Sequence, residues 1–243
     1  MVIEYMLAAL APFMVDASLG LAYYKNIQII RKNLRYVIAF ASGLVISAAF
    51  FELLPHANIS GEWFESNILF VALGFISFYV IEKLTLLHSC GEEECEVHTL
   101  GSITALGMAA DNIVDGIGIV TGFLIDPILG IVITIAVIAH EIPQAISASV
   151  LLKNSNVKNT RGFLILFLAG LFYLIGAIIA NFIPEEFYHA VIALVAGVFL
   201  YIGAGDLLSE AHKRFNLMVI VSVILGFITI ILITSLEIIV GAH

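Results

Sequence analysis

The chain has 243 residues, of which 61% are hydrophobic and only 12% are charged, and its mean hydropathy is +1.10. Soluble domains spend about a quarter of their residues on charged side chains, so this composition excludes a soluble enzyme. Its aliphatic content excludes a disordered chain, and its net charge of −9 excludes a nucleic-acid-binding protein, which needs a basic surface. The two cysteines cannot build a secreted disulfide framework. The composition therefore predicts a polytopic membrane protein.

Apolar segments of about 20 residues, the length that crosses a bilayer, follow one another along the whole chain. The first lacks the basic start and the A-x-A-like cleavage site of a signal peptide, so we interpret it as a retained helix. The expected fold is an all-α membrane protein with a single polytopic transmembrane domain, residues 1–243. The eight predicted spans are 2–22, 34–57, 67–87, 101–123, 127–151, 163–183, 189–211 and 216–240.

The basic residues predict the orientation of these spans. All ten lysines and arginines fall on one side of an eight-span arrangement. Cytoplasmic loops are enriched in Lys and Arg, so both termini are expected outside, in a multi-pass protein of the cell membrane. The opposite side has no lysine or arginine, and its charged residues are Glu62, Glu65, Asp126, Glu185 and Glu186.

The second and seventh spans resemble each other. Residues 42–57 read SGLVISAAFFELLPHA and residues 196–211 read AGVFLYIGAGDLLSEA, which aligns Glu52 with Asp206. The two spans would cross the membrane in opposite directions. We interpret them as parts of an inverted repeat, spans one to three against six to eight, around central spans four and five. Transporters commonly have this plan, with the substrate site near the repeat interface.

Two of the spans contain polar clusters at their middle, where ionisable side chains are costly and so indicate a functional site. Span four contains AADNIVDGIGIV and span five contains AHEIPQAIS. Each cluster is polar at positions i, i+1 and i+4, which places the first and third residues on one helix face, one turn apart. The candidate metal ligands are Asp111, Asn112, Asp115, His140, Glu141 and Gln144.

Three carboxylates cannot all stay ionised in a low dielectric without a positive partner. Neither cluster contains a lysine or arginine, so a divalent cation or protons must balance the charge. Imidazole nitrogen with carboxylate oxygen suits Zn²⁺, Fe²⁺, Mn²⁺, Co²⁺ and Ni²⁺, whereas Mg²⁺ and Ca²⁺ sites are more often all oxygen. Pro143 should either free the carbonyl of Ala139 as a further ligand or form only a packing kink.

Other acidic residues lie nearer the predicted span ends. We expect Asp206 to join the site from a third helix and Glu52 to be solvated at the outer membrane surface. Asp16 and Glu237 are expected to be end-of-span residues in contact with water.

The segment between spans three and four reads HSCGEEECEVH, residues 88–98. Reduced cysteines with a histidine on each side could close a tetrahedral metal site, and an acidic run is equally typical of a solvated cytoplasmic loop. The candidate loop ligands are His88, Cys90, Cys95 and His98.

These features together resemble the ZIP (Zrt/Irt-like) family of divalent-metal transporters. Span four of that family typically carries HNxxDG or HNxPEG, and span five carries HExPHE or HEIPEG. Here residues 111–116 read DNIVDG and residues 140–145 read HEIPQA. The end of span seven, GDLLSEAH, is similar to the family's DELIPE-like stretch, with Asp206 at the acidic ligand position.

The resemblance implies transport of divalent cations towards the cytoplasm through a binuclear site, an elevator-like movement and a homodimer. Here Asp111 replaces the usual histidine and Gln144 the usual acidic residue or histidine, so Fe²⁺, Mn²⁺, Co²⁺ and Cd²⁺ are rivals to Zn²⁺ as substrate. The implied ligand sets are Asp111, Asp115, His140 and Gln144 at one position, and Asn112, Asp115, Glu141 and Asp206 at the other.

Three other functions fit parts of the pattern. An intramembrane metalloprotease needs HExxH, yet Gln144 replaces its second histidine and Pro143 interrupts the helix. A carrier of organic solutes would need half-helix ends or a basic residue aimed at the solute, and the sequence indicates neither. A membrane metal sensor would leave the intramembrane cluster unexplained. The sequence therefore favours non-enzymatic transport of a divalent transition metal.

Overall fold

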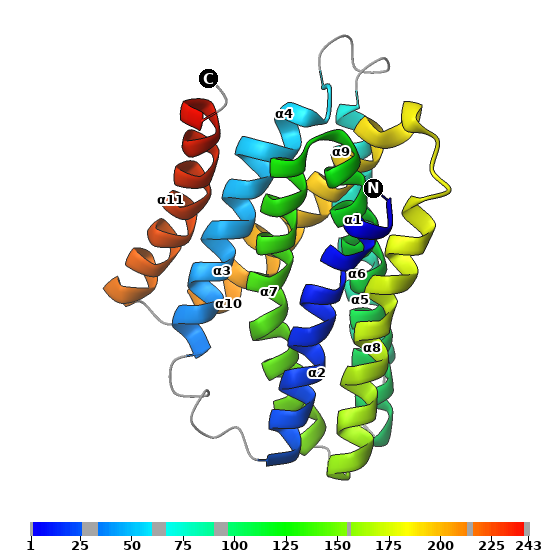
Figure 1. The fold of residues 1–243 in the computed structure, drawn as a ribbon. Helices are drawn as coiled ribbons and strands as arrows, with labels where there is room; N and C mark the ends of the chain where they lie inside the picture. Colours follow the sequence, from blue (N-terminus) through cyan, green and yellow to red (C-terminus); the bar gives the residue numbers. More distant parts are fainter. Residues whose placement is uncertain are drawn as a thin grey trace.

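Within the part of the chain that the structure, a computed structural model, describes, six helices are long and apolar enough to cross a membrane (Figure 1). The structure describes residues 2–25, 34–59, 67–89, 97–154, 157–212 and 216–240, and all regular elements in these ranges are helical. The six helices are Leu34–His56, Leu106–Ile125, Pro127–Val150, Asn159–Ala180, Glu185–Ala211 and Leu217–Ser235.

The helices follow the eight predicted segments, and some segments are divided into shorter elements. The first is interrupted at Ala9, and the second and seventh each contain a π-helical stretch. The elements are α1 (Val2–Ala8), α2 (Leu10–Lys25), α3 (Leu34–Ala48), η2 (Ala49–Leu53), α4 (Leu54–His56), α5 (Ile68–Ser89), α6 (Val97–Ile125), α7 (Pro127–Asn154), α8 (Asn159–Ala180), η3 (Glu185–Phe187), α9 (Tyr188–Leu200), η4 (Tyr201–Leu207), α10 (Leu208–Ala211) and α11 (Leu217–Val240).

A one-residue connection makes α6 and α7 antiparallel neighbours. Asp126 stands between them and accepts hydrogen bonds through Oδ1 from the backbone N–H groups of Ile128 (2.8 Å) and Leu129 (3.1 Å), which caps the start of α7. Asp111 lies 15 residues before Asp126 and His140 lies 14 residues after it. Because each helical residue rises about 1.5 Å, this turn brings the two polar clusters to the same depth.

Glycines let α3 pack closely against α11 at the left edge of the bundle in Figure 1. A Cβ on Gly43 would lie 1.9 Å from the carbonyl oxygen of Val223, and a Cβ on Gly226 would lie 2.0 Å from that of Phe40. Small residues at such contacts are typical of helix pairs in membranes, where close backbone packing replaces the hydrophobic effect.

The pair α5 and α9 repeats this arrangement. A Cβ on Gly74 would lie 2.0 Å from the carbonyl oxygen of Leu194, and a Cβ on Gly197 would lie 1.9 Å from that of Val71. In both pairs, each helix contributes one glycine that meets the backbone of the other. The two interfaces are therefore built by the same reciprocal contact.

The two similar segments found in the sequence also share a backbone irregularity. In the alignment of residues 42–57 with 196–211, the π-helical η2 falls on residues 203–207, inside the π-helical η4. A π-helical stretch is rare and often lies at a functional site. Its recurrence at matching positions is a structural similarity in addition to the sequence similarity.

Two acidic residues lie in other surroundings than the sequence suggested. Asp16 was expected in water but is completely buried in α2, and Glu52 was expected to be solvated but is buried and accepts a hydrogen bond from Thr234 of α11. A hydropathy window estimates the depth of a residue and not the face that it occupies. Both residues point to neighbouring helices. The side chain of Glu237 lies outside the described residues.

The glycine contacts predict that Gly43→Ala destabilises the protein by about 1–3 kcal/mol, the usual cost of forcing an extra methyl group into a packed interface. Gly107→Ala is the matched control, because a Cβ there meets nothing within 4 Å. Thermal unfolding of both variants in detergent should show a lower Tm for Gly43→Ala alone. An equal Tm for the two variants would contradict the close approach of α3 and α11.

Candidate metal centre

Four buried side chains from the antiparallel pair form the core of the site. Asp111 and Asp115 come from α6, and His140 and Glu141 come from α7. Each offers one ligand atom, and these atoms all lie within 4.8 Å of one another. The two polar clusters therefore come together in the structure, and these four residues could hold a metal ion.

The ring of His140 is held in an orientation suited to a metal ligand. Its Nδ1 lies 3.0 Å from the carbonyl oxygen of Ala136. A carbonyl can only accept, so Nδ1 carries a proton and donates it. This directs Nε2 at the carboxylates, 3.1 Å from Oδ2 of Asp115 and 3.9 Å from Oδ2 of Asp111. A carbonyl behind the ring is the usual partner of a metal-bound histidine.

Gln144 lies one turn beyond His140 and also reaches the cluster. Its Nε2 donates a hydrogen bond to Oδ2 of Asp111 at 3.1 Å. This hydrogen bond orients the Asp111 carboxylate. If the Gln144 amide rotated by half a turn, its oxygen instead of its nitrogen would face the Asp111 carboxylate. Pro143 lies inside α7, which continues past it. A ligand role for the carbonyl of Ala139 stays a prediction.

Asn112 lies on the other side of the cluster, towards α2 and α8. Its Nδ2 donates to the carbonyl oxygen of Ala169 at 2.9 Å and to Oδ2 of Asp16 at 3.4 Å. Asp206 is not brought to this place: it is exposed on η4, outside the four-residue group. Its predicted part in the second metal position would therefore need a movement of η4.

Two residues at the site were missed by the sequence analysis. Asp16 of α2 meets the carboxyl group of Glu141 as a side-chain hydrogen-bond partner. Tyr173 of α8 is completely buried and donates from its hydroxyl to Oε2 of Glu141 at 2.5 Å. Asp16 could have been found, because it is an acid within an apolar segment. A tyrosine in an apolar helix carries no comparable signal.

Glycines bring α8 close enough for these contacts. A Cβ on Gly116 of α6 would lie 2.2 Å from the carbonyl oxygen of Tyr173. A Cβ on Gly170 of α8 would lie 3.2 Å from Oδ2 of Asp16. The absence of side chains at these positions fixes α8 beside both α2 and α6, and thereby places the Tyr173 hydroxyl at Glu141.

Many oxygen atoms at the site have no hydrogen-bond partner in the described part of the chain. A buried acceptor without a donor costs about 1–3 kcal/mol, and more if it is charged. Native structures contain few such groups, so their concentration here indicates a missing positive charge. The unpartnered buried oxygens at the site are Oδ1 of Asp16, Asp111, Asn112 and Asp115, and Oε1 of Glu141.

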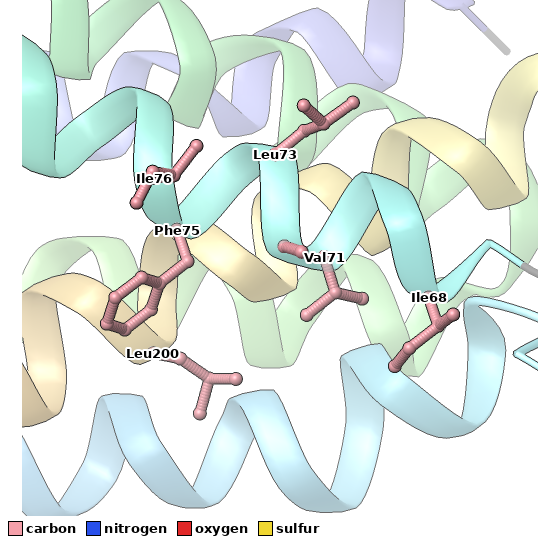
Figure 2. A pocket seen from close by; sticks show the side chains of 7 residues that line it. Ile68, Val71, Leu73, Phe75, Ile76 and Leu200 are labelled. Atoms are coloured by element: carbon pink, nitrogen blue, oxygen red, sulfur yellow. The ribbon is translucent and has the colours of Figure 1, made fainter. Parts of the chain in front are cut away.

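An apolar groove of about 610 Å³ between α5 and α9 offers no alternative cation site (Figure 2). Its lining side chains contain no nitrogen, oxygen or sulfur; they are Ile68, Val71, Ala72, Leu73, Phe75, Ile76 and Leu200. The structure does not test the predicted loop site. Cys90 and Cys95 lie outside the described residues, and so do the side chains of His88 and His98.

Comparison with known proteins points to the same kind of protein as the buried cluster of candidate metal ligands in an apolar helix bundle. The sequence model of the ZIP zinc transporter family matches residues 88–234, and the chain belongs to this family. It is thus a multi-pass membrane protein of a family of transporters, not enzymes. The resemblance inferred from the two span motifs is confirmed.

Three relatives indicate how far the similarity extends. Zinc transporter ZIP13 of Pongo abelii is 25% identical over 221 residues, which are 82% of this chain and 66% of the relative. Zinc transporter ZupT of Chlorobium limicola is 25% identical over 208 residues, 75% of this chain and 78% of the relative. Metal cation symporter ZIP8 of Rattus norvegicus is 26% identical over 123 residues, 50% of this chain and only 27% of the relative.

The hydrogen bond from Tyr173 predicts that Tyr173→Phe weakens metal binding about 10- to 100-fold, the usual effect of losing a group that orients a metal ligand. Tyr188→Phe at the start of α9 is the matched control. Zn²⁺ titrations of the purified protein should show the loss only for Tyr173→Phe. Equal affinities would indicate that Glu141 needs no orienting donor.

Proposed function

We propose that the protein transports divalent transition-metal cations across the membrane, towards the cytoplasm, through the centre formed by α6 and α7. Zn²⁺ is the foremost substrate, and Fe²⁺, Mn²⁺, Co²⁺ and Cd²⁺ are rivals. The observation that carries this proposal is the cluster of His140 with Asp111, Asp115 and Glu141, in which each carboxyl group keeps one buried oxygen without a hydrogen-bond partner. Membership of the zinc transporter family supports it.

The charge of the site supports a cation as substrate. Asp111, Asp115 and Glu141 are buried together, and no lysine or arginine is among the buried residues of the described ranges. Carboxylates in a low dielectric need an opposite charge or must take up protons. A dehydrated divalent cation supplies two charges and accepts several oxygens at once. The site would therefore hold a metal more favourably than it stays empty and ionised.

We propose two adjacent metal positions. The ligands of the first are Asp111, Asp115, His140 and Gln144, which the hydrogen bonds of His140 and Gln144 support. The second is proposed to use Asn112, Asp115 and Glu141, with Asp206 joining in a state in which η4 has moved. His140 gives the first position a nitrogen ligand, which favours Zn²⁺ and its neighbours in the first transition row.

We further propose eight membrane spans with an inverted repeat of spans one to three and six to eight around α6 and α7. Three observations support the repeat: the matching π-helical stretches, the reciprocal glycine contacts of α3 with α11 and of α5 with α9, and the position of the start of α1 and the end of α11 towards the same end of the bundle (Figure 1). Under this proposal span two packs on span eight, and span seven packs on span three. Both termini would lie outside.

The remaining proposals rest on the family resemblance and the charge pattern. Residues 1–243 would form a single transmembrane unit in the cell membrane, with residues 88–98 as a cytoplasmic metal-binding loop. A homodimer and an elevator-like movement of a bundle that includes α6 and α7 would complete the transport cycle.

The central test replaces the residue proposed to bridge both metals. In proteoliposomes, Asp115→Ala should abolish the uptake of Zn²⁺, Fe²⁺, Mn²⁺, Co²⁺ and Cd²⁺, because both positions lose a charged ligand. Glu186→Ala, the same change at an exposed acid in η3, is the control and should keep wild-type uptake. Wild-type uptake in Asp115→Ala would contradict the binuclear site. Metal binding without flux in the wild type would favour a membrane metal sensor.

Gln144→Glu tests the first position separately. A carboxylate should bind Zn²⁺ more tightly than the neutral amide does, so the Kd should fall. Without metal, the new carboxylate faces Asp111 in place of a donor and should lower the Tm, and Zn²⁺ should restore it. The Kd and the Tm are measured on the same purified variant. An unchanged Kd would show that Gln144 is not a ligand.

A further inference from the structure

Asp16 is a buried acid that does not belong to either of the ligand sets implied by the family resemblance. It lies on α2, which packs against α7 and α8, and it is completely buried. Its carboxyl group contacts two residues of the metal centre: Oδ2 lies 3.4 Å from Nδ2 of Asn112, and the group is a side-chain hydrogen-bond partner of Glu141. Asp16 is therefore in direct contact with the site described above.

The donors around Asp16 are directed at only part of the available oxygens. Nδ2 of Asn112 serves Oδ2 of Asp16 and the carbonyl of Ala169, and the Tyr173 hydroxyl serves Oε2 of Glu141. In the described structure, Oδ1 of Asp16, Oδ1 of Asn112 and Oε1 of Glu141 remain buried without a partner. Asp16 and the two residues that it meets, Asn112 and Glu141, thus each keep one buried acceptor without a donor in the described structure.

We propose that Asp16, Asn112 and Glu141 form an oxygen-only cation position beside the His140 position. This inference rests on the proposed function and adds Asp16 of α2 as an acid that the second metal position proposed above does not include. A divalent cation there would bind the three unpartnered oxygens. It would also neutralise the two carboxyl groups, Asp16 and Glu141, which cannot both be ionised at hydrogen-bonding distance in a low dielectric without an opposite charge.

The two positions differ in chemistry. The His140 position has an imidazole nitrogen, which suits Zn²⁺ and Co²⁺, whereas carboxylate and amide oxygens suit harder cations such as Mn²⁺. The Asp16 position should therefore prefer Mn²⁺ relative to the His140 position. A metal bound there would join α2 to α6 and α7, since each helix contributes one ligand.

The test measures Mn²⁺ binding to the purified full-length protein at equilibrium, by dialysis with metal analysis and by the loss of the free Mn²⁺ EPR signal. Asp16→Asn keeps the shape of the side chain and removes its charge. It should bind one Mn²⁺ fewer per chain than the wild type, or bind that Mn²⁺ at least about tenfold more weakly. Zn²⁺ binding through His140 should change by less than this.

Glu52→Gln is the matched control. Glu52 is also a buried carboxylate that accepts a side-chain hydrogen bond, in its case from the Thr234 hydroxyl, yet it lies in η2 beside α11. It should bind Mn²⁺ like the wild type. Wild-type Mn²⁺ stoichiometry and affinity in Asp16→Asn would overturn the proposal and would leave Asp16 and Glu141 as a pair that shares a proton.

A second measurement needs no variant. With the His140 position filled by Zn²⁺, the wild type should still take up Mn²⁺, and pulsed EPR should show no imidazole nitrogen bound to that Mn²⁺. Exclusion of Mn²⁺ when Zn²⁺ is limited to one equivalent per chain, or a coordinated nitrogen, would overturn the proposal; excess Zn²⁺ is avoided because it displaces Mn²⁺ from most sites. Because both experiments measure binding, a wild type that binds both cations without transporting them would contradict only the proposed function.

Discussion

The need to balance buried carboxylates inside an apolar bundle is the constraint on which the functional part of this structure depends. Four acidic side chains are buried among apolar helices, where water does not solvate them: Asp16, Asp111, Asp115 and Glu141. The available donors, the amides of Asn112 and Gln144 and the hydroxyl of Tyr173, satisfy only some of their oxygens. The unsatisfied remainder is what supports the proposal that the site binds a cation.

Helix packing determines how closely these groups approach each other. The single residue between α6 and α7 fixes the relative depth of the two motifs, and the glycines of α6 and α8 let the Tyr173 backbone approach α6. The interfaces of α3 with α11 and of α5 with α9 use the same close contact far from the site. The protein therefore uses backbone packing to place a few polar groups, rather than a large polar network.

The part of the site that could be predicted is the part encoded on single helices. Polar residues at i, i+1 and i+4 in two consecutive spans require that Asp111 and Asp115 share a face and that His140 and Gln144 share another. The short Asp126 connection makes the two spans neighbours at matched depth, and the structure shows that these faces meet. Helical periodicity and span order are thus enough to name His140, Asp111 and Asp115 as candidate metal ligands. The family resemblance carried by the same motifs was confirmed by the match over residues 88–234.

The sequence alone determined the membrane class, the approximate helix boundaries and the polar, acidic character of the middle of α6 and α7, because hydropathy and helical periodicity are local properties. Only the tertiary structure decided which acid from another helix meets the cluster. Asp206 was expected there from the span-seven motif, yet it is exposed, whereas Asp16 was expected in water and is buried against Glu141. The direction in which a side chain faces depends on how helices rotate and pack against one another. In this bundle, close contacts such as those of Gly116 and Gly170 set that rotation, and no one-dimensional pattern records it.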